Sequence, residues 1–290
     1  PTISLPNEEK LFNMSYRTED FIYHGYIAWG WASSFFKGTL NKDAKTINGT
    51  TTTYYGITAG QKKPVHMFNS FEAIDQPGEW YYDKSSDMLY IYPFEGTNSE
   101  SKLYVSNSAF DMISANGTNN LNFEGIRFTS SARRGIRLDN TNNVTINNCI
   151  FNNFGSTAVY ADTSTNFTIK NSDLYNMADS AIYVNGGNFD TFEPSGNRIT
   201  NNVIHSTGRN KEFNVPAVSI RGVEPHVDHN EFYNIPLAAI MFSAAGDKIT
   251  SVNSVIEYNK FHECCTNGVD LAVVYGGRDL RALGTKVRYN

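Results

Sequence analysis

A short phrase that begins with asparagine recurs through the second half of the chain, and it restricts the possible folds more than any other feature. The phrases NCIF, NSDL, NVIH, NEFY and NKFH begin at Asn148, Asn171, Asn202, Asn230 and Asn259. Their starting points are 23, 31, 28 and 29 residues apart. A near-constant period of this length is typical of a solenoid, in which every repeat forms one structural unit.

Each phrase stands between two short segments with β-strand character. The segments before the phrases alternate apolar and polar residues: NVTIN, NFTIK, NRITN, HVDHN and SVIEYN. The segments after them follow a polar or Gly-containing loop: TAVYA, SAIYV, PAVSI, AAIMF and LAVVY. Alternation sends every second side chain to the same face of a strand, so Val144 and Ile146 are expected to point inward. We therefore expect one coil of a right-handed parallel β-helix per repeat.

Two other folds fit the pattern less well. No repeat keeps apolar residues at helical spacing, and β-branched residues and Asn dominate. A β-sandwich would contain many short strands, but not the same phrase at a near-constant register. The recurring Asn suits a turn of a β-helix, because its amide bonds to the backbone and stacks on the equivalent residue of the next coil. The predicted fold class is all-β, with a parallel β-helix over residues 106–290.

Residues 1–105 have a different pattern. The stretch QPGEWYYDKSSDMLYIYP contains a turn at 76–78 and predicts a hairpin of the strands WYYD and MLYIYP. We therefore expect an N-terminal antiparallel β-rich portion over 1–105. At the other end, Asn290 follows Asn259 by 31 residues and has the same place in the repeat. An open coil there would be expected to continue, to be capped by a partner, or to self-associate.

Composition and short motifs indicate the class of partner and the compartment. The net charge of −5 gives no concentrated basic surface for nucleic acid, and no apolar run is long enough to span a bilayer. Five N-x-[ST] motifs predict glycosylation and therefore an extracellular, secreted protein. These candidate glycosylation sites are Asn13, Asn48, Asn116, Asn143 and Asn166.

The cysteines predict neither a disulfide framework nor a metal site. There are three of them, Cys149, Cys264 and Cys265, and their spacing does not suit zinc. Buried thiols are favoured over a bond from Cys149 to one of the adjacent pair. No metal or other cofactor is predicted.

The C-terminal part resembles a group of secreted proteins. The phrase DLAVVYGGRDL resembles Asp-x-Gly-Ala-Ile-Tyr-x-Gly-Arg-Asp-Trp, which is found in right-handed parallel β-helix repeat proteins related to glycoside hydrolases. That group includes xylosidases, xylanases and fucosidases that act on plant or algal polysaccharides. Asp270, Tyr275, Arg278 and Asp279 occupy the matching positions. The resemblance implies a β-helix fold and a polysaccharide or glycan as partner.

The chain also departs from the motifs of this group. Ala272 and Leu280 replace a glycine and the final tryptophan of that phrase. A Pro-His-x-Ala-Ile phrase is similar to PLAAI at 236–240, where Leu237 replaces the histidine. A Gly-Gly-Asp phrase is similar to residues 186–188, where Asn188 replaces the acid. The scaffold is therefore expected with a degenerate motif set.

Asp270 and Glu257 are the candidate catalytic residues. Glycoside hydrolysis uses two carboxyl groups about 5 Å apart for retention or about 6.5–9.5 Å apart for inversion. Neighbouring strands lie about 4.8 Å apart, so equivalent positions on adjacent coils suit this chemistry. A turn residue that binds its own backbone is the plain alternative for Asp270, and a solvent-facing strand position is the alternative for Glu257.

Further residues are candidates for binding the substrate. Their positions beside the candidate catalytic residues or within the C-terminal phrase suggest the role, and they are Glu224, His229, Tyr275, Arg278 and Asp279. The plain alternatives are a solvated strand face for the cluster at 224–229, and an Arg–Asp pair that fixes a turn for 278–279.

Three functions stay open at this point. The first is a carbohydrate-active glycoside hydrolase that uses Asp270 as general acid or nucleophile. The second is a carbohydrate-binding glycoprotein without turnover, which the missing histidine and acid favour. The third is a structural subunit of an extracellular filament or matrix, assembled by stacking of solenoids.

Overall fold

A computed structural model describes residues 2–4, 9–60, 63–211, 214–243, 250–277 and 279–290 of the protein. The chain divides into two compact units, Pro1–Leu103 and Tyr104–Asn290. Each unit has its own hydrophobic core. None of the helices in the described ranges is long and apolar enough to cross a membrane.

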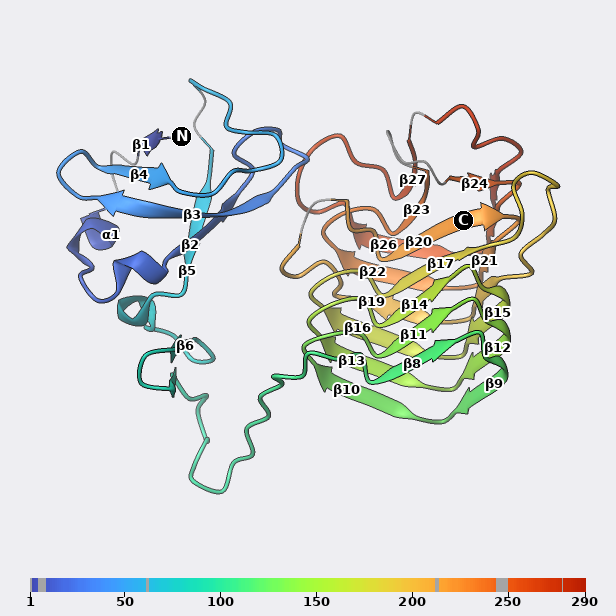
Figure 1. Cartoon of the computed structure of the whole chain (residues 1–290), viewed down its shortest axis with the longest axis horizontal. Coiled ribbons are helices and arrows are strands. Elements are labelled where there is room, and N and C mark those ends of the chain that lie inside the picture. Colours follow the sequence, from blue (N-terminus) through green and yellow to red (C-terminus); the bar gives the residue numbers. More distant parts are fainter. Residues whose placement is uncertain (1, 5–8, 61–62, 212–213, 244–249, 278) are drawn as a thin grey trace. The chain divides into compact units, whose positions relative to one another are not determined.

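The N-terminal unit is built on an antiparallel sheet with the strand order β1-β4-β3-β2-β5 (Figure 1). Its core consists of side chains on and next to these strands: Met14, Phe21, Tyr23, Ile27, Phe36 and Ile47. The elements of this unit are β1 (Thr2–Ser4), α1 (Glu9–Asn13), η1 (Thr18–Asp20), β2 (Ile22–Gly25), β3 (Ser34–Asn41), β4 (Thr46–Gly49), β5 (Val65–Phe68), η2 (Phe71–Ala73), β6 (Trp80–Asp83) and β7 (Met88–Ile91).

The hairpin predicted from the sequence is confirmed. Strands β6 and β7 pair antiparallel, with Trp80 opposite Ile91. The turn before them is closed by the N–H of Glu79, which donates to the carbonyl of Gln76 at 3.2 Å. Gly78 has a φ of 90° in this turn, a backbone conformation that suits glycine.

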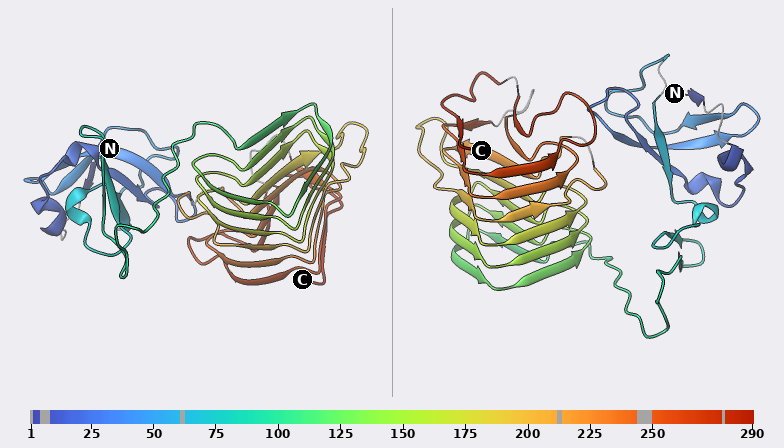
Figure 2. Two further views of the ribbon diagram at one scale, coloured as in Figure 1. Left: turned by 90° about the horizontal axis from the view of Figure 1, so that it is seen from below. Right: turned by 180° about the vertical axis from the view of Figure 1, so that it is seen from behind.

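The second unit is a parallel β-helix, as predicted. Its strands stack in three parallel sheets, and the chain visits sheets 1, 2 and 3 in turn (Figure 1 and Figure 2). Sheet 1 contains β8 (Ile113–Asn116), β11 (Ile136–Asp139), β14 (Val159–Asp162), β17 (Ile182–Gly186), β20 (Val218–Val223), β23 (Ile240–Ser243) and β27 (Val274–Gly276), and β24 (Ser251–Val252) also pairs with β20.

The other two sheets complete each coil. Sheet 2 contains β9 (Asn119–Glu124), β12 (Asn142–Asn147), β15 (Thr165–Lys170), β18 (Arg198–Thr200), β21 (His226–Asp228), β25 (Val255–Glu257) and β28 (Lys286–Arg288). Sheet 3 contains β10 (Arg127–Ser131), β13 (Ile150–Phe154), β16 (Asp173–Met177), β19 (Val203–His205), β22 (Glu231–Ile235) and β26 (Lys260–Cys264).

Columns of identical or similar apolar residues fill the interior of the β-helix. Val144 and Ile146 point inward, as predicted, and are fully buried. On sheet 3 the rings of Phe128 and Phe151 stack with centroids 4.8 Å apart. Because the same face of every strand is buried, a shift of one residue in any coil would expose its apolar side chains, and this fixes the register.

The corner between sheets 2 and 3 always consists of two residues, for example 125–126, 148–149 and 201–202. The connections on either side of sheet 1 vary instead. The segment from sheet 1 to sheet 2 has two residues at 140–141 but eleven at 187–197. The segment from sheet 3 to sheet 1 has four residues at 155–158 but twelve at 206–217. All differences in coil length therefore arise beside or within sheet 1, where β20 pairs with both β23 and β24.

The first residue of the two-residue corner is left-handed in every coil. The φ values run from 52° to 64° for Gly125, Asn148, Asn171, Asn201, His229, Tyr258 and Tyr289. Glycine and asparagine adopt this conformation most easily. In the last coils the rings compensate by stacking, with centroids 5.1 Å apart for His229 and Tyr258.

In the later coils the second corner residue forms an asparagine ladder, which is buried except at Asn290. The four residues are Asn202, Asn230, Asn259 and Asn290. Each Oδ1 accepts the backbone N–H of the preceding coil's corner residue at 2.9–3.0 Å. Each Nδ2 donates to a carbonyl of the sheet 2 strand in the preceding coil, at 3.0–3.1 Å. The ladder satisfies backbone groups that the tight corner would otherwise leave unpaired.

The predicted alignment of the asparagines was wrong by one residue in the first two phrases. Asn148 and Asn171 are left-handed corner residues that lie on the surface, one position before the ladder. Cys149 and Ser172 occupy the ladder position there, and the Ser172 hydroxyl accepts the backbone N–H of Cys149 at 3.1 Å. The register error arose because asparagine suits both positions. All three cysteines are free, as favoured from the sequence.

Replacement of Asn202 by leucine tests the ladder. The change removes an acceptor for the backbone N–H of Ser172 and donors to Ile169 and Asn230. We expect the free energy of unfolding to fall by about 3 kcal/mol, because a buried backbone donor loses its partner. Urea denaturation would measure it. Asn122→Leu, at an exposed outward position of β9, is the control and should have a small effect. Equal stabilities of both variants would contradict the role of the ladder.

Candidate functional site

The structure does not bring Asp270 and Glu257 together. Glu257 ends β25 on sheet 2, whereas Asp270 lies in the segment between β26 and β27, at the corner of sheets 3 and 1. Strand β26 separates these corners, and its five residues span roughly 15 Å. The two carboxylates therefore do not form the predicted catalytic pair.

Asp270 is an isolated carboxylate. Its side chain is exposed, its φ is 58°, and it makes no hydrogen bond or ion pair with the residues that the structure describes. The adjacent coil places Pro236 and Leu237 beside its segment, where their carbonyls accept N–H bonds from Asn267 and Cys265. The described residues of the neighbouring coil place no second carboxylate there.

The other residues of the C-terminal phrase have different surroundings. Tyr275 is half-buried on β27 and pairs in register with Met241 of sheet 1. Asp279 binds Arg281 at 2.6 Å and accepts its backbone N–H at 3.0 Å. Hydrogen bonds from Arg281 lower the pKa of Asp279 to about 2. Arg278 lies outside the described residues. An Arg–Asp pair thus stabilises this turn, with Arg281 as the partner seen.

Asp228, on sheet 2, is almost saturated by partners. Its carboxylate is 1% exposed and accepts two hydrogen bonds from Arg198 at 2.8 Å, one from Thr200 at 2.8 Å and one from His229 at 2.7 Å. Burial opposes ionisation, but these hydrogen bonds outweigh it and keep the pKa of Asp228 well below its usual range. The side chain is therefore a carboxylate at neutral pH.

Glu257 stands next to Asp228 at the same register on β25. It accepts hydrogen bonds from Arg288 at 2.7 Å and makes a contact of 3.1 Å with Nε2 of His226. The hydrogen bond from Arg288 lowers its pKa. A hydrolase needs one carboxyl group that can give up a proton, and neither of this shielded pair is poised to do so. We interpret the cluster as a clamp between coils.

The remaining predicted residues of this region lie at its edge. Glu224 is exposed, has a φ of 53°, and makes no side-chain contact with the described part of the chain. His229 is mostly exposed and bridges Asp228 to the ring of Tyr258. Glu224 therefore lies at a solvent-exposed strand edge and not in a substrate site.

Asp228→Asn tests the clamp and its pH dependence. At pH 7 we expect the variant to lose about 3 kcal/mol of stability, because a buried charged hydrogen-bond network is broken. The folded-state pKa of Asp228 is depressed. Its stabilising contribution is therefore present above the unfolded pKa near 3.9 and is lost as the pH falls through the folded value.

The stability gap between wild type and Asp228→Asn should consequently narrow as the pH is lowered from about 5 to 2. Urea titrations at several pH values would measure it. Glu224→Gln is the matched control, since this carboxylate is exposed and outside the clamp. A gap that is independent of pH would show that the charge of Asp228 does not matter.

Sheet 1 presents a polar and aromatic surface, which we call the sheet 1 outer face. Two outward columns form it in register. The first is Ser114, Arg137, Tyr160, Tyr183, Ser219, Met241 and Tyr275, and the second is Asn116, Asp139, Asp162, Asn185 and Arg221. Ser219, Arg221 and Met241 are buried, so the longest accessible part of the face runs from β8 to β17 and is about 14 Å long at about 4.8 Å per strand.

Aromatic rings and guanidinium groups lie side by side on this face. The rings of Tyr160 and Tyr183 stack with centroids 4.5 Å apart, and the guanidinium of Arg134 covers Tyr160 at 4.7 Å. Such contacts hold the rings rigidly. A rigid face of rings, charges and amides offers both stacking surfaces and hydrogen-bond partners to a polyhydroxylated ligand.

Asp139 and Asp162 form a carboxylate pair on the sheet 1 outer face. They are directly opposite each other on β11 and β14, where neighbouring strands lie about 4.8 Å apart. Asp139 binds Arg137 at 2.6 Å. Asp162 accepts neutral donors, the amide of Asn185 at 2.8 Å and the backbone N–H of Thr163 at 3.0 Å. The strand spacing suits two carboxyl groups that act on one bond from opposite sides.

The sequence carried a signal for this pair that was overlooked. Two successive strand segments, IRLD and VYAD, end in aspartate and lie 23 residues apart, from Asp139 to Asp162. Among the described strands of the β-helix, Asp228–Glu257 is the other carboxylate pair at matching register. The described residues contain no group of three or more His, Cys, Asp or Glu placed to hold a metal ion.

Comparison with known proteins agrees with the fold. The family model described as "Right handed beta helix region" matches residues 69–215. The chain belongs to the right-handed β-helix family. A solved structure titled "Glycoside hydrolase" superposes with a TM-score of 0.51 at 11% identity, covering 97% of this chain and 71% of that chain. At this identity the likeness shows the shared fold. No curated protein sequence matches significantly.

This right-handed β-helix lacks ionisable groups at two positions where the resemblance implies them. Leu237 is buried, and the neighbouring coil covers it. Asn188 is exposed, and its Oδ1 accepts the backbone N–H groups of Asp190 and Thr191 in a turn. Chemistry at the C-terminal coils therefore cannot use these side chains.

Proposed function

We propose that this right-handed β-helix protein is carbohydrate-active: it binds a polysaccharide along the sheet 1 outer face and hydrolyses glycosidic bonds there. The matching register of Asp139 and Asp162, beside Tyr160 and Tyr183, carries the proposal. The glycoside hydrolase of the same fold supports it as an analogy. Asp270, the residue first suspected, has no carboxylate partner in the described part of the chain.

The surroundings of the two aspartates suggest their roles. The ion pair with Arg137 needs Asp139 as a carboxylate, so we assign it the role of nucleophile. Asp162 is bonded by neutral donors and is assigned as general acid and then base. Strand spacing near 4.8 Å is closer to the retaining separation of about 5–5.5 Å than to the inverting one. The proposed outcome is retention of configuration.

Binding without turnover is the second candidate function. The replacements at Leu237 and Asn188 and the isolated position of Asp270 favour it, because the positions that the motif resemblance indicates do not supply a pair of acid groups. In this case the protein is a secreted carbohydrate-binding glycoprotein, and the sheet 1 outer face binds the same class of ligand.

A hydrolysis screen separates these functions. Wild type, Asp139→Asn, Asp162→Asn and Asp270→Asn would be incubated with xylans, fucans and pectins, and the reducing ends counted. We expect kcat to fall at least about 10²-fold for Asp139→Asn and Asp162→Asn, because each removes a group of the reaction. Glu263→Gln, an exposed carboxylate of β26 on sheet 3, is the control and should keep full activity.

The same polysaccharides would be tested for binding by affinity electrophoresis. The second function is supported instead if the folded wild type binds a polysaccharide without hydrolysing it and Tyr160→Ala weakens this binding. A loss of activity confined to Asp270→Asn would move the reaction to the C-terminal coils. If the folded wild type neither hydrolyses nor binds any of these polysaccharides, the carbohydrate-active role is refuted.

We also propose that the protein is secreted and glycosylated. The five sequon asparagines, Asn13, Asn48, Asn116, Asn143 and Asn166, are all exposed, so a glycan would meet no steric barrier there. Intact-mass analysis after expression in a eukaryotic secretory pathway should show hexose-containing adducts. A bare polypeptide mass from secreted material would remove the support for a glycoprotein.

A further inference from the structure

Two loops meet at one end of the antiparallel sheet in the N-terminal unit. The first, residues 26–33, joins β2 to β3, and the second, residues 50–64, joins β4 to β5. Gly25 at the end of β2 lies opposite Ser34 at the start of β3 and opposite Val65 at the start of β5. Both loops therefore lie at the same end of the sheet. Loops on a rigid scaffold of this kind often carry binding residues.

The first loop combines buried alanines with tryptophans at the surface. Its central sequence is AWGWA at 28–32. Ala28 and Ala32 are 2% and 1% exposed, whereas Trp29 is 50% exposed and Trp31 is half-buried. The N–H of Ala32 donates to the carbonyl of Trp29 at 3.0 Å and closes the turn between them. Small buried residues thus anchor a turn that carries two large rings at the surface.

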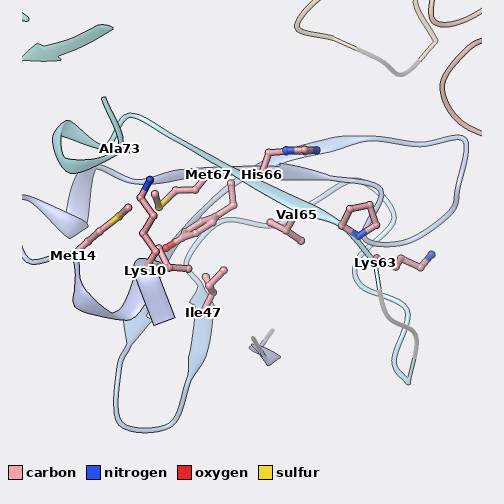
Figure 3. Close-up of a pocket in the computed structure, with 11 residues that line it drawn as sticks. Lys10, Met14, Ile47, Lys63, Val65, His66, Met67 and Ala73 are labelled. Carbon is pink, nitrogen blue, oxygen red and sulfur yellow. The ribbon is translucent and has the colours of Figure 1, made fainter. Parts of the chain in front are cut away.

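Hydrogen bonds tie the second loop to the first. The N–H of Thr58 donates to the carbonyl of Ile27 at 3.0 Å, and its hydroxyl donates to the carbonyl of Ala28 at 2.8 Å. Lys63 lines a pocket at the end opposite Lys10 (Figure 3), and its ammonium group also donates to the carbonyl of Ala28. The two loops are therefore fixed relative to each other.

Four aromatic side chains of these loops form a surface that we call the aromatic platform: Trp29, Trp31, Tyr54 and Tyr55. The rings of Trp31 and Tyr55 make an edge contact with centroids 5.1 Å apart, and Tyr54 contacts Tyr55 in the same way at 4.7 Å. Tyr54 is nevertheless 84% exposed, and Tyr55 is 40% exposed. Exposed rings that gather on anchored loops are typical of a binding surface.

The two loops are polar but uncharged, and this indicates the kind of ligand. Neither 26–34 nor 46–60 contains a charged residue, and the four threonines 50–53 directly precede Tyr54. Hydroxyl groups both donate and accept hydrogen bonds, as sugar hydroxyls do. A nucleic acid or a membrane surface would instead require several Lys or Arg side chains. Aromatic faces next to neutral hydroxyls fit a pyranose ring, which has an apolar C–H face and a rim of hydroxyl groups.

We propose that the aromatic platform is a second carbohydrate-binding site, which stacks on the sugar rings of a neutral polysaccharide. It shares its class of ligand with the proposed function, but it uses neither Asp139 nor Asp162. The platform therefore binds its ligand whether or not the sheet 1 outer face hydrolyses it. Two sites on one chain raise the affinity for a long polymer above the affinity for a short oligosaccharide.

Affinity electrophoresis of the full chain tests the platform, in gels that contain arabinoxylan, mixed-linkage β-glucan or galactomannan. We expect Trp29→Ala and Tyr54→Ala each to weaken binding about three- to tenfold, because each variant loses one stacking contact. Trp80→Ala is the matched control, since Trp80 is 64% exposed in the same unit but lies on β6, outside the platform. Binding should persist in about 0.5 M sodium chloride, because the platform is uncharged.

Two further comparisons separate this site from the proposed hydrolysis. Tyr160→Ala should retain the binding that depends on Trp29 and Tyr54. Trp29→Ala should hydrolyse a short xylo-oligosaccharide at the rate of wild type while it binds the polymer more weakly. Thermal unfolding would verify that each variant folds, and Tyr54→Ala should be as stable as wild type because its ring is exposed.

Several results would overturn the proposal. They are a folded wild type that binds none of the three polymers, platform variants that bind them as tightly as wild type, binding that Tyr160→Ala alone abolishes, and binding that is lost in salt. Platform variants that dissociate a dimer without changing polysaccharide binding would assign the rings to a contact between two copies. Hydrolysis by wild type together with unchanged binding of Trp29→Ala and Tyr54→Ala would refute the platform and leave the proposed function intact.

Discussion

The hydrogen bonds of one side-chain amide in each coil from Asn202 onward determine much of the later part of the β-helix. The corner between sheets 2 and 3 reverses the chain within two residues, which leaves backbone donors and acceptors inside the protein without strand partners. The amides of Asn202, Asn230, Asn259 and Asn290 satisfy them across coils. Because each amide contacts both its own corner and the preceding one, the corner cannot gain or lose a residue without leaving polar groups unpaired.

Because the corner between sheets 2 and 3 has a constant length, the spacing of two residues in the sequence determines whether they lie side by side on neighbouring strands. Residues one coil apart come to lie on neighbouring strands, about 4.8 Å from each other. This places Asp139 beside Asp162 and Asp228 beside Glu257. The two pairs share their geometry but differ in their partners. Two arginines and two histidines shield the second pair, whereas the first pair lies among tyrosines on a more open face.

The fold was largely predictable, because the spacing of the repeats and the alternation of apolar residues in each strand are both visible in the sequence. All the strand segments read from the sequence were found, and the N-terminal hairpin with them. The asparagine register was not, because Asn201 and Asn202 occupy adjacent corner positions that both favour asparagine, one for its backbone and one for its amide. Local sequence does not distinguish these two demands; only the hydrogen bonds between coils do.

The candidate site was predictable to a smaller extent, because its chemistry depends on contacts between coils. Glu257 looked like a free carboxylate until Arg288, 31 residues later, was found bonded to it. Asp279 pairs with Arg281 across two residues, which the motif comparison did not suggest. The aromatic residues at 29–31 and 54–55 are visible in the sequence, but only strand pairing shows that their loops meet at one end of a sheet.

The unequal connections on the two sides of sheet 1 have an evolutionary consequence. With the corner of sheets 2 and 3 closed to insertions, new sequence enters a coil beside or within sheet 1, as it has at 187–197, at 206–217 and between β23 and β24. The first two insertions lie beside the sheet 1 strands and leave their pairing in place. During evolution the loops that border the sheet 1 outer face can thus change in length, and with them the ligand that fits there, while the strands of sheet 1 are conserved.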